Sequence, residues 1–66
     1  MNDRYQFRFT FFNEVESKTV THQRECTFEE ARTYWQELLD ISRMTRSSSH
    51  KAWYRGQFGQ RWHRWK

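Results

Sequence analysis

Aromatic residues at every second position near the N-terminus constrain the fold of this 66-residue chain more than any other feature. In the segment RYQFRFTFF, residues 4–12, the aromatic positions are Tyr5, Phe7, Phe9 and Phe11, and the positions between them are polar. Because successive side chains of a strand point to opposite faces, this spacing predicts a β-strand with one buried and one solvated face. Such a strand must lie in a sheet whose aromatic face is covered by another layer.

The following segment predicts a second strand that pairs with the first. Residues 13–18, NEVESK, are polar and should turn the chain, although no Asn-Gly or Asp-Gly pair fixes a tight hairpin. Residues 19–26 place Val20, His22, Arg24 and Cys26 on one face and Thr19, Thr21, Gln23 and Glu25 on the other. Threonine and valine favour strands, but neither face is strongly apolar, so we expect an edge strand.

A capping box predicts where a helix begins. The Thr27 hydroxyl can accept from the third helical N–H group, and Glu30 can reach back to the cap. Apolar residues then recur at helical spacing up to about Met44: Ala31, Tyr34, Trp35, Leu38, Leu39 and Ile41. The polar run at residues 45–49 should end the helix.

The last twenty residues, SSSHKAWYRGQFGQRWHRWK, predict a third strand over residues 51–58. There Ala52, Tyr54, Gly56 and Phe58 alternate with Trp53, Arg55, Gln57 and Gly59, and we expect Ala52, Tyr54 and Phe58 to face the core. Gly59 can start a turn. Beyond it, Phe58, Trp62 and Trp65 fit a helical stripe, while a fourth strand paired back on the third fits equally well. Mobility of residues 60–66 is a further alternative.

Together these segments predict a single α+β domain over residues 1–66, with the order β-β-α-β(-β). The simplest way to bury the apolar faces is a small antiparallel sheet of three or four strands with one helix packed on one face.

Charge is distributed unevenly along the chain. Residues 1–46 carry seven Lys or Arg and eight Asp or Glu, a net charge of −1, whereas residues 47–66 carry five cations and no acid. Such asymmetry predicts an anionic partner for the C-terminal segment. The single cysteine, the lack of a twenty-residue apolar run and the lack of a signal-peptide pattern favour a cytoplasmic protein without a membrane partner.

The sequence carries no recognisable catalytic or metal-binding motif. Cys26 and His22 share a strand face, but no third group orients them, and a buried thiol beside a strand histidine is the favoured interpretation. The possible metal ligands are His22, Cys26, His50 and His63, and they lack the close pairs typical of short zinc-binding chains. We therefore expect a non-enzymatic protein with no cofactor and no metal.

Basic and aromatic residues interleave in the C-terminal segment. The candidate partner-binding residues are Lys51, Trp53, Arg55, Gln57, Arg61, Trp62, His63, Arg64, Trp65 and Lys66. Arginine and lysine bind phosphates, and exposed rings stack on unpaired bases. Tryptophan and arginine are also enriched at protein–protein hot spots. A purely structural alternative is that the rings complete a small core and the arginines protect the outer face of an edge strand.

The layout YQFRFTFF, TVTHQREC, TFEEARTYWQELL and KAWYRGQFGQRW resembles several small phage-encoded host modulators, including some anti-CRISPR proteins built as strand-strand-helix-strand-strand. It also resembles the arm-binding domains of phage integrases, in which a hairpin precedes an F-T-x-x-E-A helix. Members of the first group are non-catalytic and cover the nucleic-acid-binding surface of a nucleoprotein complex. The resemblance transfers no individual site residue.

Our leading hypothesis is a phage or mobile-element protein that inhibits a host nucleoprotein complex in the host cytoplasm by stoichiometric occlusion. The alternative is a module that binds DNA or RNA directly through its basic, Trp/Arg-rich C-terminal segment. A homodimer is compatible with both.

Overall fold

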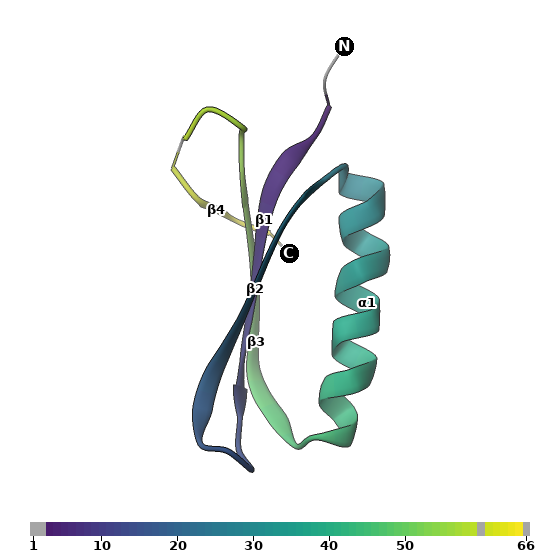
Figure 1. Ribbon diagram of the computed structural model, residues 1–66, viewed down its shortest axis with the longest axis vertical. Helices are drawn as coiled ribbons and strands as arrows, with labels where there is room; N and C mark the ends of the chain where they lie inside the picture. Colours follow the sequence, from purple (N-terminus) through teal and green to yellow (C-terminus); the bar gives the residue numbers. More distant parts are fainter. Residues whose placement is uncertain (1–2, 60, 66) are drawn as a thin grey trace.

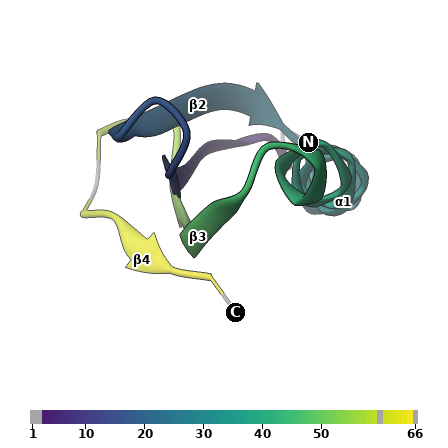
Figure 2. The ribbon, with the colours of Figure 1, turned by 90° about the horizontal axis from the view of Figure 1, so that it is seen from below.

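The chain forms one four-stranded antiparallel sheet and one helix. The structure, a computed structural model, describes residues 3–59 and 61–65. Its elements are β1 (Tyr5–Asn13), β2 (Lys18–Cys26), α1 (Phe28–Met44), β3 (Ser47–Arg55) and β4 (His63–Arg64) (Figure 1). The strand order is β2-β1-β3-β4, and the helix lies on one side of the strands (Figure 2). The predicted α+β class and element order are confirmed.

The first strand occupies an inner position, between β2 and β3, because its aromatic face supplies most of the core. Phe7 and Phe9 have no solvent exposure, and Phe11 is also buried. Their rings pack beneath α1, where Phe9 stacks on Trp35 with ring centroids 4.8 Å apart. The alternation seen in the sequence thus corresponds to one face covered by the helix and one face left uncovered.

The turn between β1 and β2 is organised by Asn13. Its side-chain oxygen accepts hydrogen bonds from the backbone N–H groups of Val15 and Glu16, at 3.0 and 3.1 Å. An Asx turn of this kind replaces the missing Asn-Gly pair. From there β2 pairs with β1 without interruption, from Asn13↔Lys18 to Tyr5↔Cys26. The predicted edge position of this strand is confirmed.

Both arms of the capping box are present at the start of α1. The Glu30 N–H donates to the Thr27 hydroxyl at 3.2 Å, and the Thr27 N–H donates to the Glu30 carboxylate at 3.0 Å. The helix buries Ala31, Leu38 and Ser42 against the sheet. Ile41, which the helical spacing assigned to the apolar face, is instead 56% exposed, because it lies at the margin of that face near the helix end.

The third strand begins earlier than the sequence indicates. The helix ends at Met44, directly before the polar run, as predicted, but Ser47 and Ser48 already pair with Asn13 and Phe12 of β1. Arg46, with a positive φ of 50°, reverses the chain, and its carbonyl accepts from the Glu14 N–H at 3.0 Å. Pairing with β1 therefore overrides the low strand propensity of these serines.

A bulge interrupts the pairing of β3 with β1. The register shifts between Thr10, which faces Lys51, and Phe12, which faces Ser48, so β3 contains one extra residue there. Ser49 has a φ of 55° within this bulge. Such a left-handed residue is typical of the bulge type that normally favours glycine.

The C-terminal segment returns as a strand and not as a helix. A turn at residues 57–59 contains Gly59 with a φ of 78°, and β4 pairs with β3 through Tyr54↔His63 and Trp53↔Arg64. The Trp65 N–H extends this pairing with a 2.9 Å bond to the Ala52 carbonyl. The strand alternative thus describes this segment over residues 61–65, and the helical stripe does not.

The prediction that Phe58 faces the core is wrong. β3 ends at Arg55, so the two-residue alternation does not continue to Phe58, which is 89% exposed. Trp65 instead packs against the core, with its ring centroid 5.2 Å from that of Phe7 and 5.9 Å from that of Phe28. Ala52 is buried as expected, and Tyr54 packs against the same cluster.

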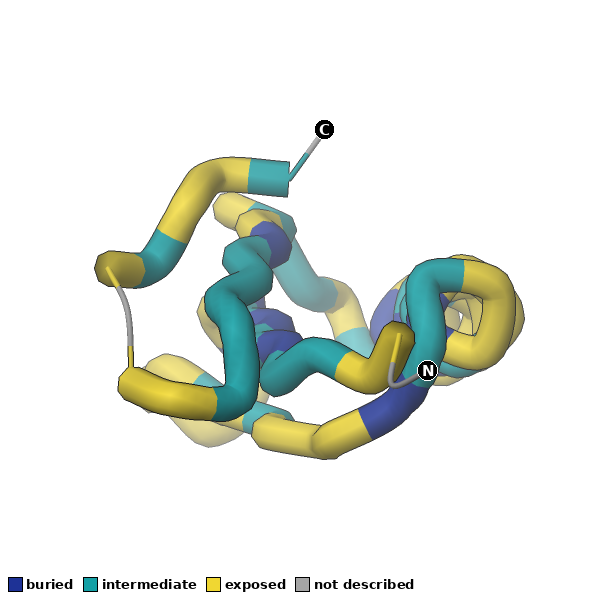
Figure 3. The backbone as a smooth tube through the Cα atoms, turned by 90° about the horizontal axis from the view of Figure 1, so that it is seen from above, coloured by how far each residue is buried: buried dark blue, intermediate teal, exposed yellow. Residues whose placement is uncertain are grey.

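Burial is concentrated in the middle of the sheet and on the side of α1 that faces it, while the outer side of the helix is exposed (Figure 3). The buried cluster consists of Phe7, Phe9, Cys26, Ala31, Leu38 and Ala52, surrounded by half-buried rings. Over residues 3–59 and 61–65, no helix has the length and apolar character that crossing a membrane requires.

Candidate functional site

No helix or strand in the described part of the chain covers the sheet face opposite α1, and we call it the open face. Strand register assigns residues to it, because directly opposed residues in antiparallel strands share a face. Arg8 of β1 lies opposite Gln23 of β2 and Trp53 of β3, and Trp53 lies opposite Arg64 of β4. The central and C-terminal part of this face comprises Gln6, Arg8, Thr10, Lys51, Trp53, Arg55, Trp62 and Arg64.

Three arginines and two tryptophans on the open face stack alternately. The order is Arg55, Trp62, Arg8, Trp53, Arg64, and we call this set the guanidinium–indole ladder. From one end to the other, the guanidinium carbons lie 4.5, 4.6, 4.8 and 5.6 Å from the centroid of the neighbouring indole. All four distances fall within the range of cation–π attraction. The ladder joins residues from β1, β3, β4 and the segment before β4.

Arg8 is the central member of the ladder and was not among the candidate residues from the sequence. Its guanidinium lies against both Trp53 and Trp62, and its Nε atom is buried with no hydrogen-bond partner in the described part of the chain. The two indoles therefore provide its main favourable contacts. In the sequence Arg8 is one of several polar residues on the outer face of a strand, and only the pairing of β1 with β3 distinguishes it.

Arg55 at one end of the ladder is fixed by a second contact. Its Nε donates to the Oε1 of Gln6, on the neighbouring strand, at 3.1 Å. A guanidinium held through Nε can still present its outer edge to a planar anion such as phosphate or carboxylate. This end of the ladder is therefore preorganised for bidentate anion binding.

The cations of the open face are not neutralised within the protein. Among the residues that the structure describes, none of Arg8, Lys51, Arg55 and Arg64 forms an ion pair. The ion pairs present lie elsewhere: Arg4 with Glu25 and Glu30, Lys18 with Glu16, and Arg43 with Asp40. The open face consequently retains a positive field that an anionic partner could use.

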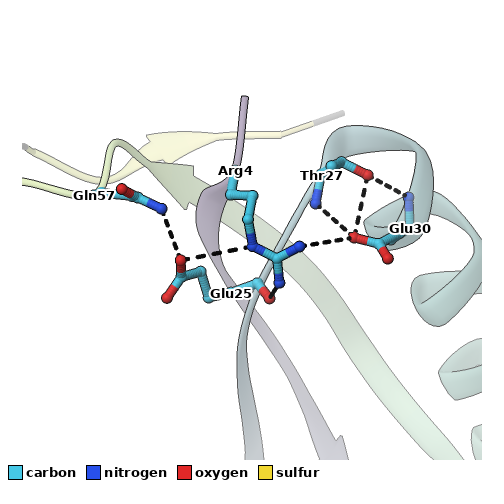
Figure 4. Close-up of polar contacts among 5 residues, drawn as sticks. All are labelled: Arg4, Glu25, Thr27, Glu30 and Gln57. Atoms are coloured by element: carbon cyan, nitrogen blue, oxygen red, sulfur yellow. Dashed lines mark hydrogen bonds and ion pairs between the residues drawn. The ribbon is translucent and has the colours of Figure 1, made fainter. Parts of the chain in front are cut away.

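One corner of the open face is closed by a polar cluster (Figure 4). The Glu25 carboxylate accepts from Gln57 Nε2 at 2.7 Å and lies 3.7 Å from Arg4 Nε. Arg4 also donates to the Glu25 carbonyl at 2.9 Å and approaches Glu30 at 3.6 Å. These contacts attach the β3–β4 loop to the end of β2. Gln57, a predicted partner-binding residue, is thus engaged inside the protein.

The charge on Glu30 is stabilised by its surroundings. The hydrogen bond from the Thr27 backbone N–H lowers the pKa of Glu30 below its ordinary value of 4.5, and the Thr27 hydroxyl and Arg4 act in the same direction. The carboxylate therefore stays ionised through mildly acidic conditions and keeps both the cap and the Arg4 contact.

The structure divides the ten predicted candidates into two groups. Five lie together on the open face: Lys51, Trp53, Arg55, Trp62 and Arg64. Of the others, His63 is exposed on the α1 side, because it pairs with Tyr54, and Trp65 packs into the core. Arg61 is exposed, and Lys66 lies outside the described residues.

The possible nucleophile and metal ligands do not converge on this face. Cys26 is 2% exposed, and burial raises the pKa of its thiol above the ordinary value of 9.0, with a further contribution from Glu30. His22 stacks on Phe11 with ring centroids 6.1 Å apart. Within residues 3–59 and 61–65, no three His, Cys, Asp or Glu side chains gather in a metal-binding arrangement.

Comparison with protein-family profiles, curated proteins and solved structures finds no match to this chain.

Proposed function

We propose that this chain is a non-enzymatic binding protein that holds a nucleic-acid strand on its open face. The observation that carries the proposal is the set of four cations on the open face, Arg8, Lys51, Arg55 and Arg64, none of which forms an ion pair within residues 3–59 and 61–65. A row of positive groups complements a polymer with one negative charge per nucleotide.

The ladder favours contact with phosphates over stacking of bases on its indoles. Each indole already has two guanidinium groups against it, so a base would have to displace an arginine. The guanidinium groups, in contrast, are held in place by the rings and need little ordering when a phosphate binds. Preorganisation of this kind reduces the entropic cost of association.

Salt dependence tests the proposal. Fluorescence anisotropy with a labelled oligonucleotide should show affinity that falls steeply with salt, with a log–log slope of about −3 if four phosphates are contacted on a single strand. Arg64→Gln should reduce this slope by about 0.7. Arg43→Gln removes the same charge from α1 and should leave the slope unchanged. Absence of binding to both single-stranded and duplex nucleic acid at low salt would refute the proposal.

The opposite charge of the helix supports a second candidate function. The exposed acids Glu29, Glu30, Glu37 and Asp40 outnumber Arg32 and Arg43 on α1, on the other side of the molecule from the ladder. A protein with one basic and one acidic side can contact both components of a nucleoprotein complex. Stoichiometric occlusion of such a complex is the mode of action of the phage-encoded modulators that the sequence resembles.

Affinity capture separates the second candidate from the first. The tagged protein should retain a nucleoprotein complex from cells that produce it, and retention should survive nuclease treatment. Glu37→Gln combined with Asp40→Gln should weaken retention, while Thr33→Ala on the same helix should not. If nuclease treatment abolishes retention and the helix substitutions do not weaken it, the second candidate function is refuted, and direct nucleic-acid binding explains the retention.

A further inference from the structure

Phe58 is an aromatic residue whose exposed ring is not part of the hydrophobic core. It is 89% exposed, and no other aromatic ring in the described residues contacts it. It lies in the loop between β3 and β4, which bulges from the sheet on the side opposite α1 (Figure 1). Gly59 follows it directly and Gly56 lies two positions before it, so few side chains in this loop can cover the ring.

The loop that carries Phe58 is tied to the sheet close to the ladder. Gln57, the neighbour of Phe58, is tied to Glu25 by a 2.7 Å hydrogen bond, which holds the loop against the end of β2. Arg55, the first member of the ladder, precedes Phe58 by three residues, so their Cα atoms are at most about 11 Å apart. About three stacked nucleotides cover that distance, at about 3.4 Å each.

Phe58 differs from the other aromatic residues near the open face. Trp53 and Trp62 carry guanidinium groups against their rings, and Trp65 packs into the core. Phe12, which lies at the far side of the bulge, is 36% exposed, against 89% for Phe58. Phe58 is therefore the ring with open faces beside the proposed phosphate-binding row.

We propose that Phe58 is a stacking site for an unpaired base, so that the open face selects single-stranded over duplex nucleic acid. This inference rests on the proposed function. The ladder holds the phosphates of the strand, and a base displaced from the backbone stacks on Phe58 at the end near Arg55. In a duplex the bases are paired and stacked inside the helix, so duplex DNA or RNA can use only the ladder. Base–aromatic stacking of this kind changes Kd by about 5- to 150-fold.

The test compares three labelled probes: a single strand of about 12 nucleotides, the duplex of the same sequence, and a single strand of abasic nucleotides with the same number of phosphates. Wild-type protein should bind the single strand more tightly than the other two. Phe58→Ala should weaken single-strand binding about 5- to 150-fold and leave duplex and abasic binding unchanged. Phe58→Tyr keeps a ring and should retain the preference.

Met44→Ala is the matched control, because Met44 is 85% exposed but lies at the end of α1, outside the open face. Thermal unfolding of Phe58→Ala should match wild type, since the ring is not buried. Equal binding of Phe58→Ala and wild type to the single strand, or an equal loss on all three probes, would overturn the base-stacking site while the salt-dependent binding persists. If wild-type protein binds none of the probes, the proposed function fails as well.

Discussion

The hydroxyl of Ser42 lies 2.8 Å from Nε2 of His50, and this contact joins α1 to β3 inside the protein. The Ser42 hydroxyl also lies 2.9 Å from the Leu39 carbonyl, to which it can donate its single proton. With that proton on the carbonyl side, the hydroxyl oxygen accepts from the Nε2–H tautomer of His50. Its ring stacks on Phe11, which explains why a polar pair can sit beside an aromatic core.

Removal of this acceptor should destabilise the fold. Ser42 is 2% exposed and His50 is half-buried, so Ser42→Ala removes a partly shielded hydrogen bond of the His50 ring, at a cost of about 1 kcal/mol. Urea unfolding followed by circular dichroism measures the loss. Thr33→Ala, on the exposed side of the same helix, should change the unfolding free energy by less than about 0.5 kcal/mol. Similar small effects of both substitutions would show that the Ser42–His50 contact does not stabilise the protein.

Relief of backbone strain at Ser49 should stabilise the fold. Ser49 has a φ of 55°, a conformation that costs a residue with a Cβ atom about 1 kcal/mol relative to glycine. Ser49→Gly should therefore raise the free energy of unfolding by about that amount. Ser48→Gly, at the neighbouring position outside the left-handed region, should lower it by about 0.5–1 kcal/mol. Opposite signs for the two substitutions confirm the bulge, and equal losses contradict it.

Lysine should not replace arginine at the centre of the ladder. The planar guanidinium of Arg8 contacts two indoles, and an ammonium group on a flexible stem cannot maintain both contacts. Arg8→Lys should lower the unfolding free energy by about 1 kcal/mol and weaken nucleic-acid binding, although the net charge is unchanged. Near-ultraviolet circular dichroism should report the loss of order at the tryptophans. Arg32→Lys on α1 is the control, and an equal effect there would rule out a specific role for the ladder.

Acid should remove part of the stability that Glu30 provides. Because the folded state lowers the pKa of Glu30 below 4.5, the carboxylate stabilises the fold above that pH, and this stabilisation is lost as the pH falls through the folded-state pKa. Glu30→Gln retains an acceptor for the Thr27 N–H but does not titrate. The stability difference between wild type and Glu30→Gln should thus be larger at about pH 6 than at about pH 3. Glu29→Gln, in the same helical turn, is the control. A difference that does not vary with pH would contradict this role.

Local signals explain which parts of the fold could be predicted. The aromatic alternation of β1 and the capping box of α1 each depend on residues within one strand or one helical turn, and both predictions hold. The start of β3 depends instead on pairing with β1 across more than thirty residues of sequence, and on two left-handed residues, Arg46 and Ser49, that no propensity favours. The exposure of Phe58 has the same origin, because it depends on where β3 ends.

The candidate site was only partly visible in the sequence for a related reason. Trp53, Arg55, Trp62 and Arg64 lie within one basic aromatic segment, and their composition alone indicated a partner-binding surface. Arg8 lies 45 residues from Trp53 in the chain, and only the register Arg8↔Trp53 brings it between the two indoles. Sequence alternation can assign a residue to a face, but it cannot specify its neighbour on the next strand.

The bulge at Ser49 determines which residues of β3 face α1 and which face the open side. Ser48 and Lys51 both face the open side, although three positions separate them, because the extra residue changes the alternation between them. If β3 kept all its residues but lost the bulge, a strand anchored at Ser48 would turn Ala52 and Tyr54 outward and direct Trp53 and Arg55 toward the helix. Deletion of the one extra residue would instead restore regular alternation between Ser48 and Lys51, so both surfaces of β3 would keep their present residues.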